Sequence, residues 1–186
     1  VREVAERLNF TPNALAQAMH SSKTGTVGLI TDDLEGRFSL PILMGAEDAF
    51  GADRTSVFLC DCGGDPIREN HHLKALVGRD VDGLIVVGAR PDQRPSISHK
   101  VPVPVVYAYA PSDSHQDVSV VTDNVMAGAL AAEHLVALGR RRIAHITGDP
   151  TYSAAQERAQ GIAATLQSHG LNQVGATMFG SWGEVW

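Results

Sequence analysis

Short apolar segments that alternate with helix-forming segments are the feature that most constrains how this chain folds. From Thr26 onward, each β-branched, apolar run is followed by a longer segment with apolar residues at helical spacing. Strands that alternate with helices in this way form parallel sheets, because each parallel connection needs a crossover that is usually a helix. The sequence therefore predicts an α/β fold of parallel sheets flanked by helices. A ligand is expected beyond the carboxyl ends of the strands.

The same periodicity gives the expected element boundaries. Strands are expected at 26–31, 56–60, 83–87, 103–107, 118–121, 142–147 and 176–179, and helices at 38–51, 65–77, 124–138 and 154–169. Asp65 followed by Pro66 is typical of a helix start, and Gly139 and Gly170 are typical of helix ends.

Composition limits the functions that the chain can perform. Of its 186 residues, 44% are hydrophobic and 19% are charged, which is ordinary for a soluble globular protein. The net charge of −6 argues against a surface that coats nucleic acid. No apolar run is long enough to span a bilayer, and residues 1–10 lack the hydrophobic region of a secretory signal. We therefore expect the protein in the cytoplasm.

The segment Thr11–Asp33 joins a short helix to the first strand. Thr11 can cap this helix, and Pro12 suits its first turn, where the missing N–H costs nothing. A helix of about nine residues is not stable alone in water, so it needs a partner on which to fold. A polar linker at 20–25 separates it from the strand.

Residues that could carry metal or catalytic chemistry are few. Cys60 and Cys62 share one face of a strand, so a thiolate pair is conceivable. A zinc site needs about four ligands and no second cysteine pair exists, so reduced structural thiols are expected. His71 and His72 point in different directions on a helix and cannot chelate one ion well. No arrangement of a nucleophile and a base recurs, and we expect no cofactor, no metal and no enzymatic activity.

Several short sequences, in order along the chain, resemble the LacI/GalR family of transcription regulators. They are FTPNALA at 10–16, VGLI at 27–30, VDGLI at 81–85, TDN at 122–124, EHL at 133–135, LGRRRIA at 138–144 and SAAQERAQG at 153–161. The resemblance implies a periplasmic-binding-protein-like (type I) core of two lobes behind a helical hinge. The expected domains are a remnant of a helix-turn-helix head with the hinge at 1–25, an N-terminal lobe at 26–139 and a partial C-terminal lobe at 140–186.

The resemblance also implies DNA contacts for the hinge. In the family, paired hinge helices of a dimer enter the minor groove, and an apolar side chain unstacks one base step. Met19 stands where relatives usually carry leucine, and it could instead be a plain apolar contact on an amphipathic helix. Asn13, Ala16, Gln17 and His20 are the other candidate DNA-contacting residues.

Arg158 and Asp123 are the first two residues that the resemblance assigns to a small effector. The planar guanidinium of Arg158 suits bidentate recognition of vicinal hydroxyls or a carboxylate. The residue could instead pair on the helix surface with Glu157 or a neighbouring carboxylate. Asp123 precedes a helix, so it can cap that helix, accept a hydroxyl of the effector, or do both.

Phe38 and Tyr109 are the two aromatic candidates. Phe38 matches a family aromatic that stacks on the ligand, but Gly36, Arg37 and Ser39 depart from the Asn, Pro and Phe that are common beside it. Tyr109 stands where relatives often carry Asp or Asn, so an aromatic side chain is expected to line the pocket. The altered loop leaves the effector class open.

These observations predict a repressor-type transcription regulator that works as a homodimer. A small effector, a sugar or related metabolite, would bind between the two lobes and control binding to operator DNA. The helix at 38–51 is the expected dimer surface. The alternative is a periplasmic-type solute-binding protein without DNA binding, which would need an export signal in place of the hinge.

Overall fold

The computed structural model describes residues 7, 23–51 and 55–182. The hinge residues expected to contact DNA (Asn13, Ala16, Gln17, Met19 and His20) lie outside the described residues. Contacts divide the chain into two units, which are described separately. The first is Val1–Ala89, Pro95–Ala108 and Ser112–Ser119, and the second is Arg90–Arg94, Tyr109–Pro111 and Val120–Trp186. No helix in the described part is long and apolar enough to cross a membrane.

The first unit is built on a five-stranded sheet with the order β2-β1-β3-β4-β5. Its strands are β1 (Thr26–Thr31), β2 (Ser56–Asp61), β3 (Gly83–Val87), β4 (Val105–Ala108) and β5 (Val118–Val120). Strand β1 pairs in parallel with both β2 and β3, and β3 pairs in parallel with β4. This arrangement confirms the predicted α/β fold with a parallel sheet.

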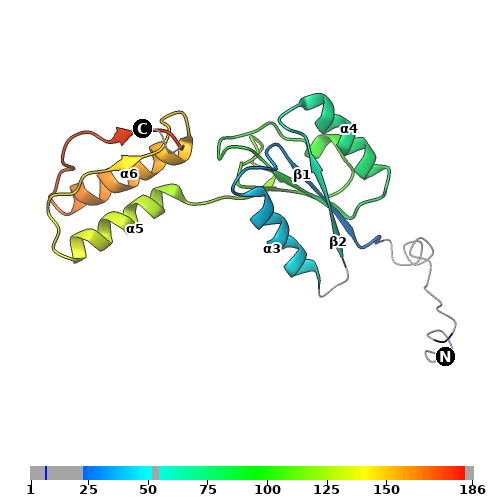
Figure 1. Cartoon of the computed structure of the whole chain (residues 1–186), viewed down its shortest axis with the longest axis horizontal. Coiled ribbons are helices and arrows are strands. Elements are labelled where there is room, and N and C mark those ends of the chain that lie inside the picture. The colour runs from blue at the N-terminus through cyan, green and yellow to red at the C-terminus, as the bar shows by residue number, and fades with distance from the viewer. Residues whose placement is uncertain (1–6, 8–22, 52–54, 183–186) are drawn as a thin grey trace. The chain divides into compact units, whose positions relative to one another are not determined.

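Helices α3 (Ser39–Gly51) and α4 (Pro66–Val77) cover opposite faces of this sheet (Figure 1). The chain goes from β1 outward to β2 and then returns past β1 to β3, so right-handed crossovers place the two helices on opposite sides. A short 3₁₀ helix spans Ser98–Lys100. The core on the α4 side consists of Ile30, Cys62, Leu73, Leu76, Val81, Leu84, Val86, Ile97 and Tyr107.

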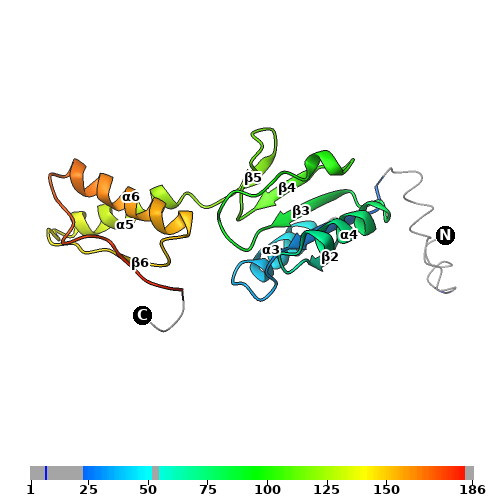
Figure 2. The same cartoon turned by 90° about the horizontal axis from the view of Figure 1, so that it is seen from above.

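The second unit contains α5 (Asn124–Ala137) and α6 (Ser153–Ser168), which lie side by side in both views (Figure 2). Two glycines allow the close approach. A Cβ on Gly128 would overlap the backbone oxygen of Arg158, and a Cβ on Gly161 would overlap that of Val125. A two-stranded parallel sheet of β6 (Ile146–Thr147) and β7 (Met178–Phe179) completes the unit.

Four strands are shorter than the sequence predicts, and two of them, β5 and β7, lose only one and two residues of the expected 118–121 and 176–179. The strand expected at 103–107 begins at Val105, because Pro104 has no N–H to donate to a sheet. The strand expected at 142–147 is reduced to the two residues of β6, because its described partner β7 is equally short.

The contact-based units also differ from the expected lobes. By its contacts, helix α5 groups with α6 in the second unit, whereas the expected N-terminal lobe at 26–139 includes α5. The domain boundaries at 25 and 139 stay predictions.

Candidate functional site

Arg158 is oriented by an amide on the neighbouring helix. Its Nε donates a hydrogen bond of 3.0 Å to Oδ1 of Asn124, the first residue of α5. Asn124 is only 5% exposed, and its own Nδ2 donates to the carbonyl of Thr122 at 3.3 Å. The two Nη atoms of Arg158 make no hydrogen bond within the described part of the chain, so they can donate to a ligand. The side chain that Arg158 contacts in the described part of the chain is therefore Asn124 and not Glu157.

Asp123 caps α5. Its Oδ1 accepts a hydrogen bond of 2.8 Å from the backbone N–H of Met126, which satisfies one of the free donors of the first helical turn. The side chain is exposed to solvent. The capping role is thus confirmed, and the contact with an effector stays a prediction.

Tyr109 has an unusual backbone conformation at the end of β4. Its φ of 71° lies in the left-handed region, which costs a non-glycine residue roughly 1–3 kcal/mol and occurs often at functional sites. Its N–H donates to the carbonyl of Val120 at 3.0 Å. Burial raises the pKa of Tyr109, Tyr152 raises it further, and the charge of Arg158 opposes this rise. Tyr109, Tyr152 and Arg158 therefore lie within electrostatic range of one another.

Arg90 and two aromatic side chains extend this group, and the sequence did not reveal them. The guanidinium carbon of Arg90 lies 4.0 Å from the centroid of the Tyr152 ring, and its Nη2 donates to the carbonyl of Thr151 at 2.6 Å. The ring of Tyr152 meets that of Trp182 edge-on, with 5.6 Å between centroids. The indole of Trp182 is 43% exposed. Arginines and partly exposed aromatic rings are typical of pockets for small polar ligands.

Asp92 connects Arg90 to the start of α6. Its Oδ2 pairs with Nε of Arg90 at 2.9 Å, and its Oδ1 accepts the backbone N–H of Ser153 at 3.1 Å. Asp92 thereby supplies the cap that no local side chain provides for α6. The partners are 61 residues apart in sequence, which is why no local motif signals the contact.

Phe38 lies in the first unit, at the end of the loop that follows β1. Its side chain is 47% exposed. The hydroxyl of Ser39 donates to the carbonyl of Asp33 at 2.6 Å, and a Cβ on Gly36 would overlap the Asp33 carboxylate. Gly36 and Ser39, which depart from the family pattern, therefore stabilise the conformation of the loop itself. The role of Phe38 in effector binding stays a prediction.

Cys60 and Cys62 differ in their burial. Both Cys60 and Cys62 are free thiols, and Cys62 is fully buried. Burial, together with Asp32 and Glu69, raises the pKa of Cys62 to about 12, so its thiol is protonated at neutral pH. No group of three or more potential metal ligands occurs among the residues that the structure describes.

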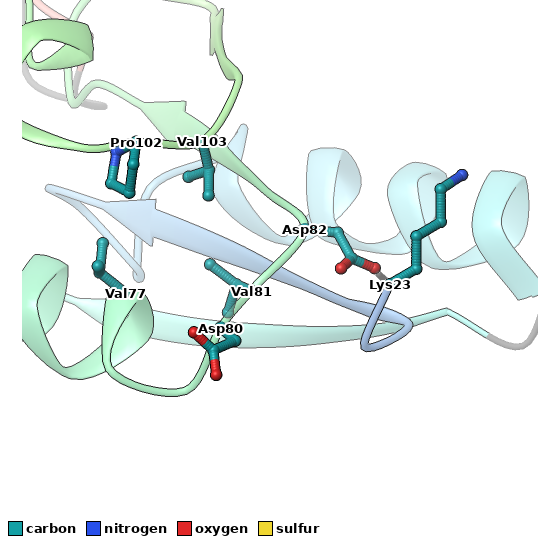
Figure 3. A pocket seen from close by; sticks show the side chains of 7 residues that line it. All are labelled: Lys23, Val77, Asp80, Val81, Asp82, Pro102 and Val103. Carbon is teal, nitrogen blue, oxygen red and sulfur yellow. The ribbon is translucent and has the colours of Figure 1, made fainter. Parts of the chain in front are cut away.

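A cavity of about 380 Å³ lies at the amino-terminal edge of the first unit's sheet (Figure 3). It is lined by Lys23, Val77, Asp80, Val81, Asp82, Pro102 and Val103. None of the residues predicted to bind the effector lines it.

Comparison with known proteins agrees with the fold. Residues 24–178 match the family described as periplasmic binding proteins and sugar binding domain of LacI family. The ribose operon repressor of Escherichia coli K12 is 33% identical over 177 residues, and the maltose regulon regulatory protein MalI of the same strain is 31% identical over 173 residues. A crystal structure of a LacI-family regulator from Rhizobium etli superposes with a TM-score of 0.76 at 23% identity, covering 87% of this chain and 58% of that one.

The fold places the chain in the type I periplasmic-binding-protein class. Within that class the chain belongs to the family of periplasmic binding proteins and LacI-type sugar-binding domains. The two E. coli relatives are matched over 92% of this chain, which spans about half of their length (53% and 51%). Both are transcription regulators by name, which favours the regulator over the solute-binding alternative.

Proposed function

We propose that the whole protein is a repressor-type, DNA-binding transcription regulator of the LacI family that responds to a sugar or related small metabolite. Operator DNA and the effector are its partners, and its place of action is the cytoplasm. The names of the ribose operon repressor and the maltose regulon regulatory protein support a sugar-linked regulatory role. We propose Arg158, Asp123, Tyr109 and Phe38 as effector-binding residues, and Met19, Asn13, Ala16, Gln17 and His20 as DNA-binding residues.

The orientation of Arg158 by buried Asn124 is the observation that carries the effector proposal. One nitrogen of the guanidinium is fixed at 3.0 Å from Asn124, while both Nη atoms are left without protein partners in the described part. A guanidinium fixed in this way loses little further side-chain freedom when it binds, so more of its hydrogen-bond energy contributes to affinity. Vicinal hydroxyls of a sugar match the spacing of two such donors.

We also propose that the protein forms a homodimer through α3. Leu43, Ala46 and Phe50 are half-buried against the rest of the first unit. Leu40 and Met44 are 50% and 63% exposed and lie one turn apart on another face of the helix. Large apolar side chains that remain exposed together on one helix are typical of a surface that binds a partner.

A two-part experiment tests the proposed regulator. A thermal-shift screen against a panel of pentoses, hexoses and their phosphates should give at least one compound that raises the melting temperature. The whole protein should then select a discrete DNA sequence from a random pool, and that compound should change the affinity for it. Selection of no DNA sequence would contradict the proposed function.

A further inference from the structure

One carboxylate binds two consecutive backbone N–H groups just before β1. Oδ1 of Asp82 accepts hydrogen bonds from the backbone N–H of Thr24 at 2.8 Å and from its hydroxyl at 3.2 Å. Oδ2 accepts the backbone N–H of Gly25 at 2.8 Å. The backbone N–H of Asp82 in turn donates to the carbonyl of Thr26 at 2.7 Å. The start of β3 is therefore joined to residues 24–26 by four hydrogen bonds.

The same short segment is also bound on its other side. The backbone N–H of Ser56, at the start of β2, donates to the carbonyl of Gly25 at 2.8 Å. Gly25 has a φ of 68°, in the region that favours glycine, so the chain turns at this residue in a defined way. Residues on both neighbouring strands therefore fix the direction in which the chain enters the sheet.

The carboxylate of Asp82 remains ionised at neutral pH. Burial by itself would raise the pKa of Asp82, but the N–H groups of Thr24 and Gly25 hold the pKa below its usual value. Hydrogen bonds to an ionised acceptor are about twice as strong as those between neutral groups. An asparagine at this position would offer one acceptor oxygen and would turn its NH₂ group toward an N–H donor.

The bound segment is continuous with the predicted DNA-binding hinge. Lys23 lines the 380 Å³ cavity beside Asp82, and Figure 3 shows both side chains at the same end of β1. Met19, the predicted wedge residue, precedes Thr24 by five residues, which span at most about 17 Å even when fully extended. A change in the chain's direction at Thr24 would therefore displace Met19.

We infer that Asp82 is the positioning residue through which the core sets the path of the DNA-binding hinge. The inference rests on the proposed function, because it needs the hinge to bind operator DNA. If the Asp82 contacts are lost, the segment before β1 samples more conformations, and the hinge must be ordered at additional entropic cost when it binds DNA. The effect should fall on operator affinity and leave effector affinity unchanged.

The test uses the whole protein and the DNA sequence that the wild type selects from a random pool. We expect Asp82→Asn to lower affinity for this DNA about tenfold. The matched control Asp80→Asn, which removes an exposed carboxylate at the rim of the same cavity, should bind like the wild type. Calorimetric affinity for the sugar that gives the wild type its largest thermal shift should be equal in all three proteins. Unchanged DNA affinity in Asp82→Asn would overturn the inference.

An inserted Gly-Gly between Ser22 and Lys23 separates positioning from a general loss of stability. The insertion should weaken DNA binding in the wild type but cause little further loss in Asp82→Asn, because both changes break the same connection. Fully additive losses would overturn the inference. If Asp82→Asn does not fold, the insertion alone serves as the test. It leaves the Asp82 contacts intact but lengthens the chain between them and the hinge, so unchanged DNA binding would overturn the inference. A wild type that selects no DNA would refute the proposed function itself.

Discussion

Nε of Arg158 on α6 donates a hydrogen bond of 3.0 Å to Oδ1 of Asn124 at the start of α5. The pair joins the two helices at the residue proposed to bind the effector. The neighbouring Asp123 caps α5, so two adjacent residues perform separate tasks. One stabilises the helix end, and the other orients the arginine.

Asn124→Ala should therefore weaken effector binding while Arg158 remains in place. Loss of one hydrogen bond to a charged group is worth about 1.5–3 kcal/mol, so we expect the dissociation constant to rise at least tenfold. Calorimetric titration with a compound found by thermal shift measures this change. The matched control is Asn70→Ala on α4, which also removes an asparagine whose Nδ2 donates to a backbone carbonyl. Equal affinity in Asn124→Ala and Asn70→Ala would contradict the positioning role of Asn124.

Gly161→Ala should destabilise the second unit, because the added Cβ would overlap the backbone oxygen of Val125 on α5. Overpacking of this kind costs about 1–3 kcal/mol or more, since backbone cannot move aside as a flexible side chain can. Gly45→Ala on α3 is the control, since its Cβ meets no atom within 4 Å. That substitution should raise the unfolding free energy by about 0.5–1 kcal/mol. Urea unfolding monitored by circular dichroism distinguishes the two, and a stabilising Gly161→Ala would show that the helices can separate without cost.

The ionisation of Asp117 should make the stability of the protein depend on pH in the acid range. The hydroxyls of Ser112 and Ser96 donate to its Oδ2 at 2.5 and 2.7 Å, and these bonds lower its pKa from 3.8 to about 2. Because the folded pKa is the lower one, the stabilisation is complete above about pH 5 and is lost as the pH falls through about 4 toward 2. Between about pH 5 and pH 3, the urea midpoint of Asp117→Asn should fall less than that of the wild type. Asp48→Asn on α3, with the same charge change, should follow the wild type.

The exposed face of α3 predicts the oligomeric state. Leu40→Asp combined with Met44→Asp should shift the protein from dimer to monomer in sedimentation velocity, because two charges would be buried without partners at the interface. Ile67→Asp is the control, because Ile67 is 80% exposed and belongs to α4, the helix on the opposite face of the sheet from α3. A wild type that is monomeric at micromolar concentration would refute the proposed dimer surface.

Local signals explain which parts of the fold could be predicted. Asp65 and Pro66 mark the start of α4, and the carboxylate of Asp65 does accept the N–H of Ile67 at 2.8 Å. Gly139 and Gly170 follow α5 and α6 with φ values of 75° and 67°. Each of these features depends on residues within one helical turn, so the sequence alone contains the information.

Long-range contacts explain the rest. The length of β6 depends on β7, more than 30 residues later, so a run of apolar residues at 142–147 could not define it. The hydrogen bond between Arg158 and Asn124 joins residues 34 positions apart, and the stacking of Arg90 on Tyr152 joins two distant loops. The sequence predicted Arg158 as a ligand residue, but the side chain that orients it became visible only in the folded structure.

Calorimetric titration of Arg158→Ala tests the central claim most directly. The titrant is the sugar that gives the largest thermal shift with the wild type. Arg141→Ala is the control, since Arg141 is an exposed arginine that lies after α5, outside the proposed site. We predict that Arg158→Ala lowers affinity at least tenfold or abolishes measurable heat, whereas Arg141→Ala binds like the wild type. Unchanged affinity in Arg158→Ala would contradict the assignment of the effector site.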